Sequence, residues 1–243
     1  IKNNSDEKNK KTTADSGLNN AVLSDATTGE DLVTAFLNSN STLTANDIST
    51  FMADVLLPTT DLVMDRAEKK DKVSLFINKD LCDISEALVF TEPYYNYKNR
   101  NIIIKENLKY VEESLYNDKE LHYHIAYLRD RFMNYAQSLI HGDLHSGSIF
   151  INENGIKVID PEFAFYGPMG YDIGNVIGNL VFPYANKYYT DKNNEKFLDY
   201  ILKKIVEVVD KTKEKITRKY DEVVKFPLYK NEKFKNKYIN GIM

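Results

Sequence analysis

The residues best suited to chemistry lie in one stretch, HGDLHSGSIFINENGIKVIDPE, at positions 141–162. Carboxylate oxygens suit Mg²⁺, which keeps several waters and takes one or two protein carboxylates together with phosphate oxygens. Asp160 and Glu162 are two residues apart, so an extended backbone would point both side chains the same way, and we predict them as metal ligands. Asp143 would then be free to accept a proton from a substrate hydroxyl, the division of labour found in phosphoryl transfer.

A predicted β-hairpin positions these groups. The β-branched runs SIFI (148–151) and IKVI (156–159) are short strand candidates, and Asn154-Gly155 between them is a strong hairpin signal. His141-Gly142-Asp143 precedes the first strand and Asp160 ends the second, so the turn should bring the acids together. HGD or DPE alone is common in turns. The two motifs on either side of a predicted hairpin favour a functional site over chance.

The neighbouring polar residues have two interpretations each. His141 is either a general base or, as we favour without a Ser-His-Asp order, a structural residue whose ring bonds the backbone of the loop. His145 is either a metal ligand or, with Gly142, part of a substrate loop, which we prefer. Ser148 can offer its hydroxyl to metal or phosphate. Asp172 either complements a helix dipole or braces the Asp143 loop, and chemistry alone leaves that choice open.

Composition narrows the class of protein. The 243 residues suffice for one large domain or two small ones, and the net charge of -4 gives no general attraction to nucleic acid or to an anionic membrane. No apolar run is long enough for a membrane span, and no signal peptide is visible. The single Cys82 excludes an internal disulfide framework and favours a reducing compartment, so we expect a cytoplasmic protein.

The chain outside the hairpin is mostly helical by pattern. Residues 1–44 are polar, lack a Gly-rich phosphate loop and are expected to be a tail or remnant, with a short helix near 32–37. Helices are predicted from a cap at Thr44 or Asn46 to Pro58, and over 65–77, 118–138, 195–220 and 231–239. Another should follow the Gly/Pro loop after the hairpin, where Gly174 and Gly178 suggest close packing on a neighbour. The expected fold class is α+β, mostly helical.

The motif order identifies a resemblance. HGDLHSGSIF followed by KVIDPEFAFYGPMGYDIGNVIGNL resembles the S-methyl-5-thioribose kinases, a family in the aminoglycoside-phosphotransferase and choline-kinase branch of protein-kinase-like folds. The likeness is dense over 139–180 and looser over most of 45–240. It implies that 45–243 is a kinase-like C-terminal lobe truncated at its C-terminus. The family's N-terminal lobe, with a Gly-rich loop and an ATP-anchoring Lys, is not found in 1–44, and its sugar-contacting arginines would follow position 243.

The resemblance also implies an activity. It is the ATP- and Mg²⁺-dependent phosphorylation of a small sugar, S-methyl-5-thioribose, at its anomeric hydroxyl in methionine salvage, by a protein that is a homodimer when full length. Asp143 matches the catalytic carboxylate, and Asp160 and Glu162 match the metal ligands. Ser148 stands where most of the wider superfamily has a metal-binding Asn. The alternatives are a relative acting on an aminoglycoside, choline or homoserine, and a non-catalytic binding module.

The resemblance assigns two scaffold residues as well. His141 and Asp172 match the positions that hold the catalytic loop in place in the family.

Overall fold

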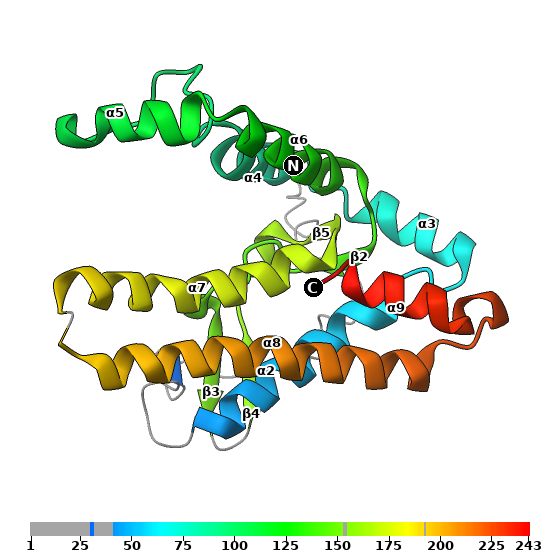
Figure 1. The fold of residues 1–243 in the computed structure, drawn as a ribbon. Helices are drawn as coiled ribbons and strands as arrows, with labels where there is room; N and C mark the ends of the chain where they lie inside the picture. Colours follow the sequence, from blue (N-terminus) through cyan, green and yellow to red (C-terminus); the bar gives the residue numbers. More distant parts are fainter. Residues whose placement is uncertain (1–29, 32–40, 153–154, 192) are drawn as a thin grey trace, which may run out of the picture.

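The computed structural model describes residues 30–31, 41–152, 155–191 and 193–243. The predicted α+β, mostly helical class is confirmed (Figure 1). The described α-helices are α2 (Ser41–Leu56), α3 (Arg66–Leu75), α4 (Lys79–Ser85), α5 (Leu108–Val111), α6 (Lys119–Asn134), α7 (Met169–Thr190), α8 (Glu195–Val223) and α9 (Glu232–Asn240). The predicted helix near 32–37 lies outside the described residues.

The described strands form two small antiparallel sheets. One has the order β1-β3-β4, with β1 (Glu30–Asp31), β3 (Ile149–Asn152) and β4 (Gly155–Val158). The other pairs β2 (Ser138–Ile140) with β5 (Phe165–Gly167). Short 3₁₀ segments in the described residues are η2 (Leu57–Thr59), η4 (Lys105–Asn107), η6 (Ser146–Ser148), η7 (Pro161–Phe163) and η8 (Pro227–Lys230). Two π-helical segments are η3 (Glu86–Thr91) and η5 (Glu112–Tyr116).

The core of the body lies where α8 packs against both α2 and α7; Figure 1 shows α7 and α8 running side by side and α2 crossing α8 obliquely. Ile48, Met52 and Leu56 follow one another at four-residue spacing, so they share one face of α2, and all three are buried against the core. The helix begins at Ser41, so Thr44 and Asn46 lie within it and do not cap it as predicted.

An arm made of α4, η3, α5, η5 and α6 projects from this body (Figure 1). Phe132 of α6 joins the two parts: it is 1% exposed, and its ring centroid lies 4.9 Å from Phe90, 5.0 Å from Phe165 and 4.9 Å from Tyr171. Such aromatic contacts add to the free energy gained by burying the rings. The arm is therefore packed against both β5 and α7.

Two sequence predictions in this region are wrong. The helix expected over 118–138 ends at Asn134, because residues 138–140 leave it to pair with β5. Gly174 and Gly178 do not mark a tight helix contact, since a Cβ added at either would meet nothing within 4 Å among the described residues.

The predicted hairpin is confirmed. Strand β3 pairs with β4 in a register that sets Ile149 opposite Val158 and Asn152 opposite Gly155. Gly155 has a φ of +113°, which only glycine adopts readily. The connecting residues 153–154 lie outside the described residues. The helices expected over 65–77, 195–220 and 231–239 are present as α3, α8 and α9.

Among the helices that the structure describes, none is both long enough and apolar enough to span a membrane.

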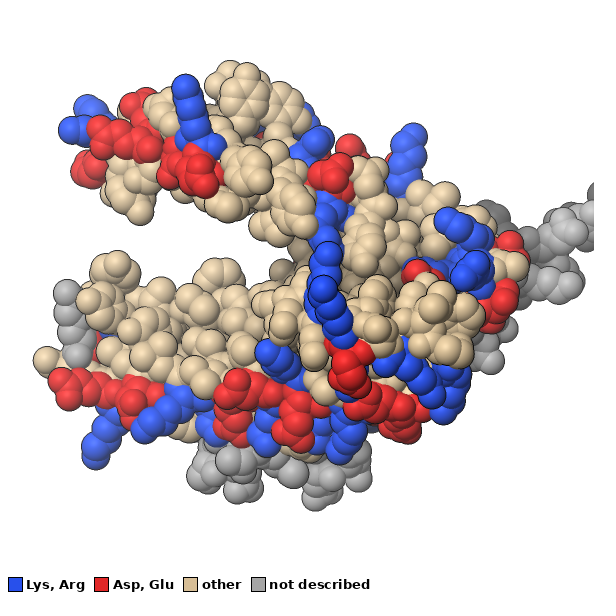
Figure 2. All heavy atoms as spheres, turned by 45° about the vertical axis from the view of Figure 1, so that its right-hand side comes forward, with Lys and Arg blue, Asp and Glu red and all other residues tan. Residues whose placement is uncertain are grey.

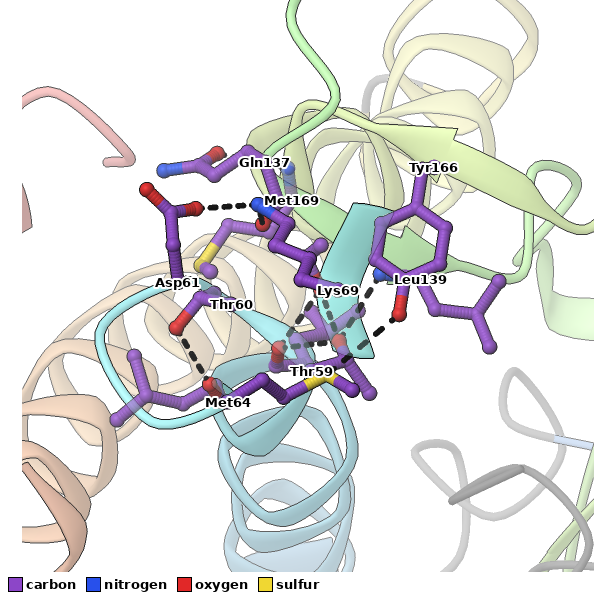
Figure 3. Close-up of polar contacts among 12 residues, drawn as sticks. Thr59, Thr60, Asp61, Met64, Lys69, Gln137, Leu139, Tyr166 and Met169 are labelled. Carbon is purple, nitrogen blue, oxygen red and sulfur yellow. Dashed lines mark hydrogen bonds and ion pairs between the residues drawn. The ribbon is translucent and has the colours of Figure 1, made fainter. Parts of the chain in front are cut away.

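Side chains of the segment between α2 and α4 form hydrogen bonds with the backbone in and next to β2 (Figure 3). Lys69 of α3 is only 8% exposed; its Nζ donates to the carbonyl of Gln137 at 3.0 Å and forms an ion pair with Asp61. The Thr59 hydroxyl accepts the N–H of Leu139 at 2.9 Å. The backbone just before this strand and at its middle residue is thus bonded by side chains 68 to 80 positions earlier in the chain.

We expect Lys69→Met to lower the free energy of unfolding by about 1–3 kcal/mol, because it leaves the Gln137 carbonyl and Asp61 without their donor. Urea denaturation followed by far-ultraviolet circular dichroism measures the loss. Lys70→Met is the matched control, since Lys70 is the next residue of the same helix and is exposed. Equal stability of the two variants would contradict the role assigned to Lys69.

Candidate active site

The carboxylate of Asp172 holds the loop that carries Asp143. Asp172 lies in the first turn of α7 and is 1% exposed. One of its oxygens accepts the N–H of His141 at 2.6 Å, and the other accepts the N–H of Gly142 at 3.0 Å. The sequence allowed two roles for Asp172, complementing the helix dipole or bracing the Asp143 loop. These hydrogen bonds support the second role.

The His141 ring joins the same loop to the residues after β4. Its Nε2 lies 2.8 Å from the carbonyl oxygen of Ile159, and its Nδ1 accepts the N–H of Asp143 at 3.3 Å. An acceptor Nδ1 and a donor Nε2 define the neutral tautomer that carries its proton on Nε2. The ring is 2% exposed and is therefore placed to hold backbone.

Gly142 brings the loop against η7. Its φ is +81°, and a Cβ at this position would lie 2.3 Å from the carbonyl oxygen of Phe163, so a larger residue does not fit. A further bond runs from the N–H of Ile159 to the carbonyl of Ser148 at 3.0 Å. These contacts set Asp143 beside the segment 159–163, which carries the other two acids.

The three predicted acids are accessible to solvent. The side chain of Asp143 is 49% exposed, and Asp160 and Glu162 are exposed. None of the three pairs with a Lys or Arg among the residues that the structure describes. The extended backbone predicted for 160–162 is wrong: Asp160 is left-handed, with a φ of +58°, and Pro161 starts a 3₁₀ turn because its fixed φ suits the first helical position.

The donor set fits a hard divalent cation. Asp160 and Glu162 offer carboxylate oxygens that no side-chain cation of the described residues neutralises. Mg²⁺ commonly takes one or two such carboxylates and completes its shell with water and phosphate oxygens. Within the described ranges no three His, Cys, Asp or Glu side chains cluster as an all-protein metal site would require.

The other predicted residues surround Asp143. His145 Nδ1 accepts the N–H of Gly147 at 3.0 Å, and its Nε2 lies 3.6 Å from the Asp143 carboxylate, longer than a hydrogen bond. Ser148 is 3% exposed and its hydroxyl donates to the carbonyl of Asp143 at 3.3 Å. The hydroxyl of Ser146 donates to the side chain of Asn179 on α7 at 3.2 Å.

A cavity of about 370 Å³ opens between the arm and α7. In Figure 2 the walls of this recess carry few charged side chains. Tyr171 is one of the lining residues, and burial, with a smaller effect from the carboxylates of Asp172 and Asp143, raises the pKa of its hydroxyl. Other lining residues are Phe90, Leu128, Arg131, Phe132 and Asn175.

The comparisons with known proteins agree with the geometry. Residues 85–202 match the model of the phosphotransferase enzyme family (APH). The chain is 44% identical over 139 residues to a methylthioribose kinase of Geobacillus sp. (strain WCH70), covering 57% of this chain and 34% of that protein. It is 42% identical over 167 residues to the methylthioribose kinase of Escherichia coli O45:K1 (strain S88 / ExPEC), covering 67% and 40%. The resemblance predicted from the sequence is confirmed.

The chain thus spans between about a third and two fifths of the length of the curated relatives it matches.

Burial raises the pKa of Asp172 from 3.8 to about 6, although the two backbone donors favour the ionised form. The folded protein therefore binds this proton more tightly than the unfolded chain does. The resulting stabilisation is complete below pH 3.8 and is lost as the pH rises through about 6. At 1.36 kcal/mol for each pKa unit, it amounts to at most about 3 kcal/mol.

We expect the difference in unfolding free energy between wild type and Asp172→Asn to fall as the pH rises from about 4 to about 7.5. Urea titrations at several pH values measure it, and other titrating groups cancel in the difference. A difference that is constant or that grows with pH would contradict the raised pKa.

Proposed function

From this kinship we propose that the protein carrying this chain phosphorylates S-methyl-5-thioribose at its anomeric hydroxyl, with ATP as donor, in methionine salvage. The observation that carries the proposal is the contact of the Asp143 loop with the segment that bears Asp160 and Glu162. Phosphoryl transfer to an alcohol needs a proton acceptor beside carboxylates that can hold a metal ion, and no Lys or Arg of the described residues neutralises Asp160 or Glu162.

Asp143 is the residue that we assign to the sugar hydroxyl. Its carboxylate is accessible and accepts the proton as the hydroxyl attacks. Asp160 and Glu162 would hold Mg²⁺, which supplies neutralisation of the charge on the phosphate oxygens. Ser148 would support the nucleotide side of the site. His145 would contact the substrate.

The cavity between the arm and α7 favours a neutral thiosugar. Its walls are largely apolar, and Arg131 is the cation among its lining residues. A polycationic aminoglycoside or a quaternary ammonium such as choline would meet an unfavourable charge there, whereas a methylthio group gains from leaving water.

Three finer assignments belong to the same proposal and rest on the resemblance. Residues 45–243 are a kinase-like C-terminal lobe and 1–44 are a polar tail or remnant, the full-length protein is a homodimer, and the reaction takes place in the cytoplasm.

We expect Asp143→Asn in the full-length protein to lower kcat by about 10²- to 10⁴-fold with little change in ATP binding, because the amide cannot accept the proton. A coupled assay of ADP release measures turnover, and calorimetry with Mg²⁺ and ATP measures binding. Asp210→Asn on α8 is the matched control, since Asp210 is exposed. A kcat near that of wild type would overturn the catalytic assignment.

We expect the same assay to show turnover with S-methyl-5-thioribose and none with choline, homoserine or an aminoglycoside. Turnover with choline but not with the thiosugar would reverse the choice of substrate.

A further inference from the structure

We propose that Asn78 is a positioning residue for the metal site, because its side-chain amide fixes the backbone that carries Glu162. This inference rests on the proposed function in one respect, the assignment of Asp160 and Glu162 as the residues that hold the cation. Asn78 itself is 84 positions from Glu162 in the chain.

The amide of Asn78 bonds two carbonyls of the turn. Its Nδ2 donates to the carbonyl oxygen of Glu162 at 2.7 Å and to that of Ala164 at 3.1 Å. One NH₂ group has two N–H donors, so both of them are used. The two bonds lie on either side of Phe163, whose carbonyl oxygen is the group that Gly142 approaches.

The turn at 160–164 has few internal hydrogen bonds. Within the segment 160–164 the structure shows one backbone bond, from the N–H of Ala164 to the carbonyl of Pro161 at 3.1 Å. A single 3₁₀ turn is a weak element on its own. Asp160 before it is in a left-handed conformation, which costs free energy for a residue other than glycine. External bonds therefore decide where the Glu162 backbone sits.

Asn78 is itself held firmly. Its backbone is left-handed, with a φ of +46°, a conformation that Asn tolerates better than most residues do. Its carbonyl accepts the N–H of Cys82 at 2.9 Å, which anchors it to the start of α4. Two residues earlier, the carbonyl of Phe76 accepts the N–H of Tyr166 of β5 at 3.2 Å. The segment 76–78 is thus fixed to both the arm and β5.

A loosened turn should weaken binding of the ion. Mg²⁺ demands near-ideal octahedral geometry, so its affinity depends on where each ligand oxygen is held. Groups that bond and orient a ligand residue typically contribute tenfold to 100-fold to metal affinity or activity. We expect loss of the Asn78 amide to weaken metal binding by about tenfold.

The test replaces Asn78 by glycine, which keeps the left-handed backbone and removes the amide. Mn²⁺ serves as the probe: it is titrated into the full-length protein in the presence of ATP, and free Mn²⁺ is read from its electron paramagnetic resonance signal. The matched control is Asn99→Gly. Asn99 is also left-handed, with a φ of +51°, and it is exposed in the loop between η3 and η4.

The proposal requires that Asn78→Gly weaken Mn²⁺ binding by about tenfold while Asn99→Gly stays within about twofold of wild type. A folded Asn78→Gly protein with wild-type affinity would overturn it. Wild-type protein that binds no Mn²⁺ would overturn the metal assignment itself. Wild-type protein that binds Mn²⁺ but does not phosphorylate the thiosugar would refute only the proposed reaction.

Asn78→Asp gives an independent measurement if the glycine variant does not fold. It keeps the shape of the side chain and adds a negative charge, but it supplies no N–H donor. Charge alone would strengthen cation binding, whereas lost positioning weakens it. Weaker Mn²⁺ binding by this variant supports the proposal, and unchanged or stronger binding contradicts it.

Discussion

The candidate site depends on one buried carboxylate. Asp172 uses its two oxygens to bond two consecutive N–H groups of the loop at His141 and Gly142. A buried acid is costly unless its oxygens are bonded, and a buried N–H is costly without an acceptor, so each side of this contact satisfies the other. The left-handed Gly142 can then lie close against Phe163 of η7, and Asp143 follows it in the chain.

Asp172 can bond the loop only if β2 and the start of α7 are held at a fixed separation. Gln137 forms hydrogen bonds that connect the two elements. Its backbone carbonyl accepts a hydrogen bond from Lys69 Nζ, and this bond fixes the residue before β2. Its side-chain oxygen accepts the N–H of Met169, the first residue of α7, at 3.0 Å. Aromatic packing around Phe132 adds a third connection, from the arm. The loop is therefore positioned by residues that never approach its carboxylate.

Local patterns were enough to predict the parts of the site that are close in sequence. The hairpin followed from its strand runs and from Gly155, and the long helices followed from their apolar spacing. Strand β2 was missed because it is only three residues long and pairs with a strand that follows the whole hairpin. Asn78 carries no motif, and its partner lies 84 positions away, so no short-range signal could find it. The backbone at 160–162 was misjudged because Pro161 favours a turn over an extended chain.

The acids at this site have a cost that the rest of the structure offsets. Asp143 lies on one of two contacting segments, and Asp160 and Glu162 lie on the other. Among the described residues none of the three is paired with a Lys or Arg. Like charges brought together without partners raise the free energy of the folded state. The chain places buried bonds on either side of them, from Asp172 to the loop and from Asn78 to the turn. A divalent cation bound by these carboxylates would neutralise part of their negative charge. Part of its binding free energy would then come from relieving the repulsion between them.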